Sequence, residues 1–322
     1  MNIQEIAKLA GVSPSTVSRV FNHSPKISRE VCRRVLEVAE KHHYYPRLTD
    51  KQRNVLLLIP QESGYPAHYC VERLVIALSG ELHNYNFHVE ILPWSDKSTL
   101  LNKQFFAAAA IGMEPEIFAD WNDDFNQALV ILDRKIPANT QGVFQVSSDE
   151  FTAMADAVNH FKTNNLKKIG CLIYNAPDSS NAKLRFQAAF TALKNAGYPT
   201  DGELFSYVSE DNFIEKVDSM LKQNADALLC PGSSGGLLTA YALNLLGKKI
   251  PQDISIISTE VAFFSPYATP PHTTLSPDYQ EMAKKVVEIF KASLTGNITK
   301  KVIEIPYRLI ERNSVKKQQP QP

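Results

Sequence analysis

The residues best suited to chemistry stand near the N-terminus, in the run Val12–His23 that reads V-S-P-S-T-V-S-R-V-F-N-H. Ser13 suits a helix N-cap and Pro14 the first helical position, so the run predicts the start of a short helix. At helical spacing, two valines and a phenylalanine fall on one face, and hydroxyl, amide and guanidinium groups fall on the other. These polar groups donate hydrogen bonds to phosphates and base edges, and Arg19 suits a bidentate contact with guanine. The run therefore predicts a helix that is inserted into DNA, with Pro14 limited to apolar contact.

Two further helices are needed to hold this one. Asn2 and Glu5 form a capping-box pattern at the start of the first, and Gly11 ends it with a tight turn. The third begins after Ser28 and stops at Pro46. Helix, glycine turn and helix within about twenty residues match helix-turn-helix spacing, although a piece of an ordinary helical bundle has the same outline. The shortness and polarity of the second helix favour the DNA-binding interpretation.

The charge of the chain is divided unevenly. Residues 1–53 contain ten Lys or Arg and five Asp or Glu, a charge of +5. Because the whole chain is neutral, the remainder carries −5. A length of 322 residues exceeds one usual domain, and 44% hydrophobic content fills more than one core. We therefore expect a small basic head that binds a polyanion and a larger body.

Several classes of protein are disfavoured. The four cysteines are far apart and form no C-x-x-C pair, which argues against disulfides and a zinc site. The eight histidines include no H-E-x-x-H, and no G-x-S-x-G supplies a nucleophile elbow, so we expect no metal, no cofactor and no enzymatic activity. The N-terminus does not resemble a signal peptide, and no apolar run approaches the length of a membrane span. These observations predict a cytoplasmic protein without membrane contact.

The body alternates short apolar runs with amphipathic segments, which is typical of parallel sheets wrapped by helices. We expect an all-α three-helix head followed by an α/β body of two doubly wound parallel-sheet subdomains. The expected bounds are 1–46 for the head, 47–53 for the linker, about 54–147 with 278–297 for the first subdomain, and about 148–277 with 298–322 for the second. Within the body, the Pro-rich stretch Ser265–Pro277 is expected to be a loop and Val302–Leu309 a last strand.

Ligands of such sheets bind outside the carboxyl ends of the strands, where three charged side chains stand. Asp133 ends the strand A-L-V-I-L-D, Arg185 lies early in a helix, and Glu260 follows the strand I-S-I-I-S-T. An ion pair at a helix end or on the surface is the alternative explanation for each. Together they predict a polar site between the two subdomains.

A glycine-rich loop and three tyrosines are further candidates for this site. The loop P-G-S-S-G-G, which contains Gly232 and Ser233, precedes a helix and suits an anion. It lacks the lysine of a nucleotide-binding loop, so a phosphorylated or acidic ligand is the more modest hypothesis. Tyr65, Tyr69 and Tyr207 are candidates to stack on a ligand ring, although such aromatics equally often close a cleft.

The head resembles the DNA-binding head of the lactose and galactose repressor (LacI/GalR) family of bacterial transcriptional repressors. The likeness rests on the run I-A-x-x-A-G-V-S-x-x-T-V-S-R-V-x-N followed by I-S and Y-x-P, from Ile6 to Pro46. The resemblance implies that Pro14 and Ser15 read bases in the major groove beside Arg19. It gives the remaining DNA-facing positions as Thr16, Ser18, Asn22, Ile3, Ser28, Tyr44 and Leu48.

Three segments of the body resemble the periplasmic-binding-protein-like effector domain of the same family. They read S-S-N-A-K-L-R, P-Q-D-I-S-I-I and P-P-H-T-T-L. The resemblance implies that Asp133 and Arg185 hold the hydroxyls of an effector, either a sugar or a sugar-derived compound such as a phosphorylated sugar. The chain departs from the family where Gly232 and Ser233 replace an Asn-Asp pair and where Glu260 replaces an aspartate.

These features together predict a dimeric repressor that binds a palindromic operator under the control of a small-molecule effector. One short helix covers half a site, and two-fold dimers read both halves. The family pairs through the helices predicted here at Tyr69–Tyr85 and Asp278–Leu294, and the tail Asn313–Pro322 has no leucine heptads for a tetramer. The linker is shorter than the family's hinge, so either Leu48 replaces the usual minor-groove wedge or the linker only tethers the head.

Two alternatives stay open. An altered pocket suits a regulator whose body answers to a protein partner in place of a small molecule. The two-part body also resembles periplasmic sugar-binding proteins, which makes a solute-binding module a third interpretation. The DNA-binding head at the N-terminus argues against that third interpretation.

Overall fold

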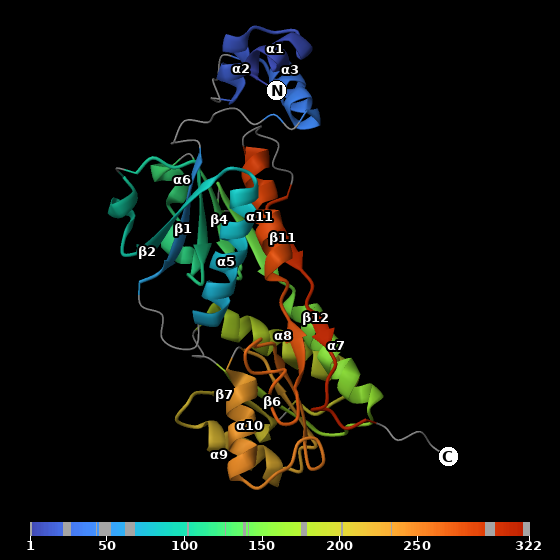
Figure 1. Cartoon of the computed structure of the whole chain (residues 1–322). Coiled ribbons are helices and arrows are strands. Elements are labelled where there is room, and N and C mark those ends of the chain that lie inside the picture. Colours follow the sequence, from blue (N-terminus) through green and yellow to red (C-terminus); the bar gives the residue numbers. More distant parts are fainter. Residues whose placement is uncertain are drawn as a thin grey trace.

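The computed structural model places a small helical head at one end of an elongated molecule, with two α/β subdomains stacked below it (Figure 1). The described residues are 2–21, 27–42, 44, 53–61, 68–101, 103–125, 127–137, 140, 142–174, 179–200, 202–232, 234–293 and 300–317. Within them, no helix is both long enough and apolar enough to cross a membrane.

The head consists of α1 (Ile3–Leu9), α2 (Pro14–Phe21) and α3 (Arg29–Lys41). The predicted capping box is present, because Asn2 Oδ1 accepts from the amides of residues 4 and 5 and the Glu5 carboxylate accepts from the Asn2 amide. Gly11 has φ +64°, a left-handed conformation that suits the turn between the first two helices. The buried core of the head comprises Ile6, Ala7, Ala10, Val17, Val20 and Val35.

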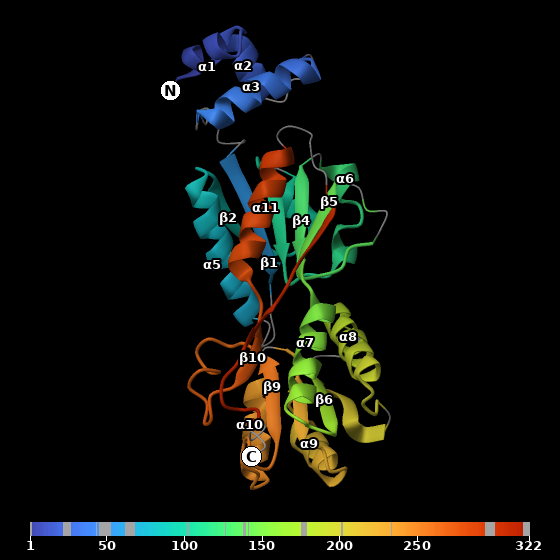
Figure 2. The same cartoon turned by 90° about the vertical axis from the view of Figure 1, so that its right-hand side faces the viewer.

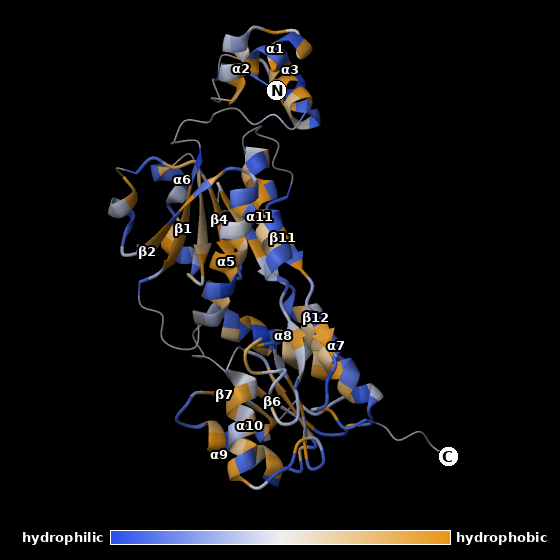
Figure 3. Cartoon of the chain, viewed as in Figure 1, coloured by the Kyte–Doolittle hydropathy of each residue, from blue (hydrophilic) through white to orange (hydrophobic). Residues whose placement is uncertain are grey.

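The N-subdomain is built on a six-stranded, all-parallel sheet in the order β11-β5-β4-β3-β1-β2. Its strands are β1 (Asn54–Pro60), β2 (His88–Trp94), β3 (Ala107–Ile111), β4 (Ala128–Leu132), β5 (Val143–Ser148) and β11 (Val302–Ile305). The helices α5 (His68–Asn84) and α11 (Tyr279–Ser293) cover one face, and the short helices η1 (Lys97–Leu100), η2 (Pro115–Phe118) and α6 (Trp121–Asp124) lie toward the other. Because both faces are covered, the central strands are continuously apolar, as their orange colour shows (Figure 3).

The C-subdomain has a second six-stranded sheet in the order β12-β10-β9-β8-β6-β7. All its pairs are parallel except β10 with β12. The strands are β6 (Ile169–Tyr174), β7 (Phe205–Val208), β8 (Ala227–Cys230), β9 (Ser255–Thr259), β10 (Thr273–Ser276) and β12 (Arg308–Ile310). One face packs against α7 (Glu150–Thr163) and α8 (Ser180–Ala196), and the other against η3 (Gly202–Leu204), α9 (Phe213–Lys222) and α10 (Gly235–Leu245).

The chain passes between the two sheets three times: between β5 and α7, between β10 and α11, and between β11 and β12. These passages lie in the narrow waist of the molecule, where Figure 2 shows β11 running from the upper sheet toward the lower subdomain. The predicted last strand Val302–Leu309 is therefore two strands, one in each sheet, and residues 302–305 belong with the N-subdomain sheet rather than with the second subdomain. Pro306, which has no amide hydrogen to donate, stands between the two strands.

Two elements of the C-subdomain depart from the sequence prediction. The Pro-rich stretch 265–277, expected to be a loop, contains β10, which lies between β9 and β12. Its T-T-L-S residues suit a strand, but the surrounding prolines hid it. The edge strand β7 was also not predicted. Neither change moves the carboxyl ends of the sheet away from the waist.

Candidate functional site

The start of α2 is held by a hydroxyl cluster. Ser13 Oγ accepts from the amide of Thr16 at 3.1 Å, which is the N-cap bond expected from the sequence. The same oxygen lies 2.8 Å from Ser15 Oγ and 2.8 Å from Thr16 Oγ1. The hydroxyls at the tip of α2 are therefore arranged by the cap.

The exposed face of α2 carries the predicted DNA-reading side chains. Val17 and Val20 are buried in the head core. Pro14, Ser15 and Arg19 are exposed, and Thr16 and Ser18 are half-buried at the edge of this face. The arrangement leaves a guanidinium and a hydroxyl available to a surface that docks against α2.

The other head positions predicted to face DNA lie in different surroundings. Ser28 is exposed, and its Oγ accepts from the amide of Val31 at 3.4 Å at the start of α3. Ile3 packs against the head core, as does Tyr44, whose ring meets Phe21 edge-on with centroids 6.1 Å apart. Partial burial raises the pKa of Tyr44. The remaining two positions, 22 and 48, lie outside the described residues.

A second polar site lies at the waist, at the carboxyl end of β4. Asp133 adopts φ +56°, and its Oδ1 accepts from the amide of Ser148 at 2.9 Å. Its Oδ2 accepts from Cys70 Sγ at 3.6 Å, and a thiol is a weak donor. Asp133 thus links the ends of β4 and β5 with α5.

Arg185 enters the same site from α8 in the C-subdomain. Its Nε donates to Glu150 Oε1 at 3.0 Å, and the Tyr307 hydroxyl donates to the same oxygen at 3.0 Å. Glu150 is 6% exposed, and its other oxygen, Oε2, is buried without a hydrogen-bond partner among the described residues. Sequence reasoning missed Glu150, because an acid in the first turn of a helix is explained by the helix dipole alone.

The electrostatics of this cluster follow from burial and proximity. Burial raises the pKa of Glu150, Arg185 opposes that shift, and Asp133 adds to it. Burial alone would lower the pKa of Arg185, but the neighbouring acids raise it overall. Burial and Asp133 raise the pKa of Cys70 to about 12, and burial holds the pKa values of Tyr279 and Tyr307 well above their ordinary range. The thiol and the two phenols are therefore uncharged at neutral pH.

Gly232 lets the end of β8 approach this cluster. It has φ +113°, and a Cβ at this position would lie 3.1 Å from the Tyr174 carbonyl oxygen and 3.9 Å from Arg185 Nη1. Its amide donates to Thr259 Oγ1 at 2.9 Å. The predicted partners at positions 65 and 233 lie outside the described residues.

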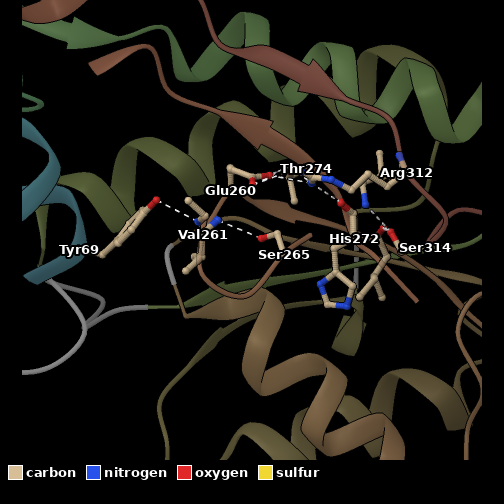
Figure 4. Close-up of polar contacts among 11 residues, drawn as sticks. Tyr69, Glu260, Val261, Ser265, His272, Thr274, Arg312 and Ser314 are labelled. Carbon is tan, nitrogen blue, oxygen red and sulfur yellow. Dashed lines mark hydrogen bonds and ion pairs between the residues drawn. The ribbon is translucent and has the colours of Figure 1, made fainter. Parts of the chain in front are cut away.

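Glu260 is surrounded by groups of its own subdomain (Figure 4). Arg312 donates to both of its oxygens, from Nη1 to Oε2 at 2.8 Å and from Nη2 to Oε1 at 3.0 Å. Thr274 Oγ1 also donates to Oε2. Arg312 Nη1 donates further to the carbonyl of His272 at 2.6 Å. An effector that bound Glu260 would have to share this carboxylate with Arg312.

The two described tyrosines occupy different places. Tyr69, on α5, accepts from the Ala262 amide at 3.0 Å (Figure 4). Its ring meets Phe263 edge-on, with centroids 5.7 Å apart. It therefore joins the N-subdomain to the loop after β9, beside a cavity of about 220 Å³ that Glu260 also lines. Tyr207 instead stacks on Phe186 with centroids 5.2 Å apart, within the apolar cluster under α8. The structure thus brings Asp133, Arg185 and Gly232 together, but Tyr207 lies elsewhere.

Comparisons with known proteins agree over nearly the whole chain. The model of bacterial regulatory proteins of the lacI family matches residues 2–47, and that of the periplasmic binding protein-like domain matches residues 158–315. The HTH-type transcriptional repressor PurR of Aliivibrio salmonicida is 25% identical over 98% of this chain and 99% of its own length. The HTH-type transcriptional regulator DegA of Bacillus subtilis is also 25% identical, over 97% of each chain.

Solved structures show the same fold. The transcriptional regulator CelR–cellobiose complex superposes with a TM-score of 0.70 at 20% identity, covering 98% of this chain and 99% of that one. The lac repressor dimer bound to operator and the anti-inducer ONPF gives a TM-score of 0.68 at 18% identity, covering 98% of each chain. A helical head followed by two parallel-sheet subdomains is therefore the shared architecture.

Proposed function

The chain belongs to the LacI family of bacterial regulatory proteins, and on that premise we propose that it is a transcriptional repressor controlled by a small-molecule effector. The observation that carries the proposal is α2, a capped helix whose inner face is fixed in a three-helix core and whose outer face is polar. Such a helix, with its N-terminal residues outward, suits the major groove.

Within α2, Arg19 and Ser15 are the proposed base-reading residues. Both are exposed, and Arg19 has the geometry for a bidentate contact with guanine. Pro14 offers only apolar contact. Thr16 and Ser18 stand at the edge of the same face, where hydroxyls contact phosphates.

The proposed operator is two-fold symmetric, because the protein is proposed to act as a dimer. An apolar stripe on α10 supports pairing in the C-subdomain: Leu237, Tyr241 and Leu245 follow each other at a spacing of four residues and are 37%, 55% and 55% exposed. The opposite side of α10 is buried in its own subdomain. Ile76 on α5, 57% exposed, extends the proposed contact into the N-subdomain.

The effector is proposed to bind at the waist. Asp133 belongs to the N-subdomain, and Arg185 and Glu150 belong to the C-subdomain, so a ligand that contacts all three bridges the two. A ligand that contacts both subdomains favours one relative position of the two. The helices α5 and α11 transmit that change of position toward the heads. Both oxygens of Glu260 already accept from Arg312, which leaves this carboxylate less available to a small molecule. That observation supports the second candidate, a regulator that answers to a protein partner.

Selection of bound sites from random DNA, followed by affinity measurement, tests the DNA-binding part. The expected result is a palindromic site, with Arg19→Ala losing about 5- to 150-fold in specific affinity for each half-site, equivalent to roughly 1–3 kcal/mol for each guanine contact. Binding to unrelated DNA should change far less, because most phosphate contacts remain. A selected site without symmetry, or equal loss on all DNA, would contradict the proposal.

A further inference from the structure

The groups at the waist carry an unbalanced charge. Asp133 and Glu150 come from different subdomains but belong to one cluster. Asp133 Oδ1 accepts from the amide of Ser148, two residues before Glu150, and Glu150 Oε1 accepts from Arg185 Nε. The neighbouring thiol and phenols of this cluster are uncharged at neutral pH, as described above. Arg134, next to Asp133, forms an ion pair with Glu114, with Nε 3.1 Å from Oε1. Among the described residues, two carboxylates therefore share one guanidinium.

Each carboxylate also keeps one oxygen with little or no hydrogen bonding. Glu150 Oε1 accepts from Arg185 and from Tyr307, but Oε2 is buried and has no hydrogen-bond partner among the residues that the structure describes. Asp133 Oδ1 accepts from a backbone amide, but within the described part of the chain Oδ2 accepts only from a thiol at 3.6 Å. Glu150 Oε2 is buried and Asp133 is half-buried. A carboxylate oxygen that is shielded from water without gaining a good donor costs free energy, so both positions favour a ligand that brings donors.

We propose that the effector bears a protonated amine, and that this amine binds between Asp133 Oδ2 and Glu150 Oε2. The inference rests on the proposed function and specifies the ligand of the same site. An ammonium group offers three donors, no acceptor and a positive charge, which matches two acceptor oxygens and an excess of negative charge. The ligand class is an amine-bearing polyol, with its hydroxyls left for the remaining polar groups of the waist.

A phosphorylated ligand suits these residues less well. Arg185 already donates through Nε to Glu150, and an anion placed beside it would face two carboxylates. The glycine-rich loop offers little compensation, because the Gly232 amide donates to Thr259 Oγ1. A neutral hydroxyl would supply a donor and leave the charge unbalanced. The charge count therefore separates the three ligand classes.

A matched panel tests the inference by titration calorimetry on the full-length protein. Glucosamine, galactosamine and mannosamine are each compared with the parent hexose and with the hexose 6-phosphate. At least one hexosamine should bind ten-fold or more tightly than its parent hexose, and the 6-phosphates should bind more weakly than either. A hexose or a hexose 6-phosphate that binds as tightly as the corresponding hexosamine would overturn the inference, and so would a panel without binding.

Two variants assign the preference to the proposed residue. Glu150→Gln keeps the size of the side chain and an acceptor for Tyr307, and it should reduce the hexosamine preference to about one. Asp226→Asn is the matched control. Asp226 accepts from the amides of Lys167 and Lys168 at the amino end of the C-subdomain sheet, away from the waist, so this variant also loses a carboxylate and a hydrogen bond. It should leave the preference unchanged. An unchanged preference in Glu150→Gln would refute the assignment.

Failure of this inference is distinguishable from failure of the proposed function. The same preparations are assayed for binding to the selected operator in the absence of any ligand. Operator binding without an amine preference removes the ligand proposal alone. Loss of sequence-specific DNA binding in the wild-type protein removes the proposed function, whatever the calorimetry shows.

Discussion

Arg312→Met should make the protein unfold at a markedly lower urea concentration than the wild type. Arg312 and Glu260 are nearly buried, with side chains 17% and 11% exposed, and they share two hydrogen bonds of 2.8 and 3.0 Å. Arg312 also joins the C-terminal segment to β10 through the His272 carbonyl and the Thr273 hydroxyl. The variant leaves the Glu260 carboxylate buried without its counter-ion.

The expected size follows from this burial. Removing one partner of a buried ion pair costs about 3–5 kcal/mol, because the remaining charge is uncompensated. With a denaturant dependence of roughly 1–3 kcal/mol per molar urea, the midpoint should fall by about 1–5 M. The double variant Glu260→Leu with Arg312→Met removes both charges and should recover most of the loss.

Circular dichroism during urea unfolding measures the effect, and fluorescence localises it. Both tryptophans, Trp94 and Trp121, lie in the N-subdomain, so their fluorescence reports that half of the body. The circular-dichroism transition should move earlier than the fluorescence transition. A midpoint shift below about 0.3 M, or a double variant as unstable as the single one, would refute the reasoning. If the stable double variant no longer responds to effector, Glu260 contacts the ligand as the sequence predicts.

Three further predictions concern the head, the dimer and pH. Ser13→Ala should lower the stability of the head by about 1 kcal/mol and weaken operator binding, because the N-cap bond to the Thr16 amide is lost, and Ser13→Asp should restore both in melting and DNA-binding assays. Tyr241→Lys should convert the dimer to monomers in equilibrium sedimentation, whereas the same change at the exposed Ile117, on the opposite subdomain, should not. His272 is fully buried, and burial lowers its pKa to about 4. Since the unfolded chain takes up a proton between pH 6.5 and 4 that the folded chain does not, the free energy of unfolding should fall by up to about 3 kcal/mol over that window, and His272→Leu should lack this part of the slope.

The head was predictable because its signals are local. A cap, a glycine turn and a short amphipathic helix lie within one stretch of chain, and each determines its own geometry. The central strands were equally predictable, since a continuously apolar run such as Ala107–Ile111 indicates a strand that is buried on both faces. The fold class, the head helices and the central strands therefore followed from pattern, whereas β7, β10 and the division of the last strand did not.

The contacts at the waist were harder to predict from the sequence, because they join segments that are far apart in the chain. Glu150 and Arg185 are 35 residues apart, and Glu260 and Arg312 are 52 apart. Periodicity does not reveal which carboxylate meets which guanidinium, so the sequence predicted Arg185 as a site residue but gave no sign of its ion-pair partner Glu150. The strand that divides at Pro306 was hidden for a similar reason, because which sheet each half joins depends on tertiary pairing.

The charge arrangement at the waist also bears on how an effector would act at a distance. Asp133 and Glu150 carry like charges on different subdomains, and the single Arg185 guanidinium paired with Glu150 offsets only part of their repulsion when the subdomains approach. A bound ammonium reverses the sign of that interaction and favours the arrangement in which both oxygens reach it. Tyr69 already links α5 to the loop after β9, so a change in subdomain spacing has to be accommodated at α5, one of the proposed dimer surfaces. A ligand that binds only one of the two carboxylates has no differential interaction with the two arrangements, and it should occupy the site without changing operator affinity.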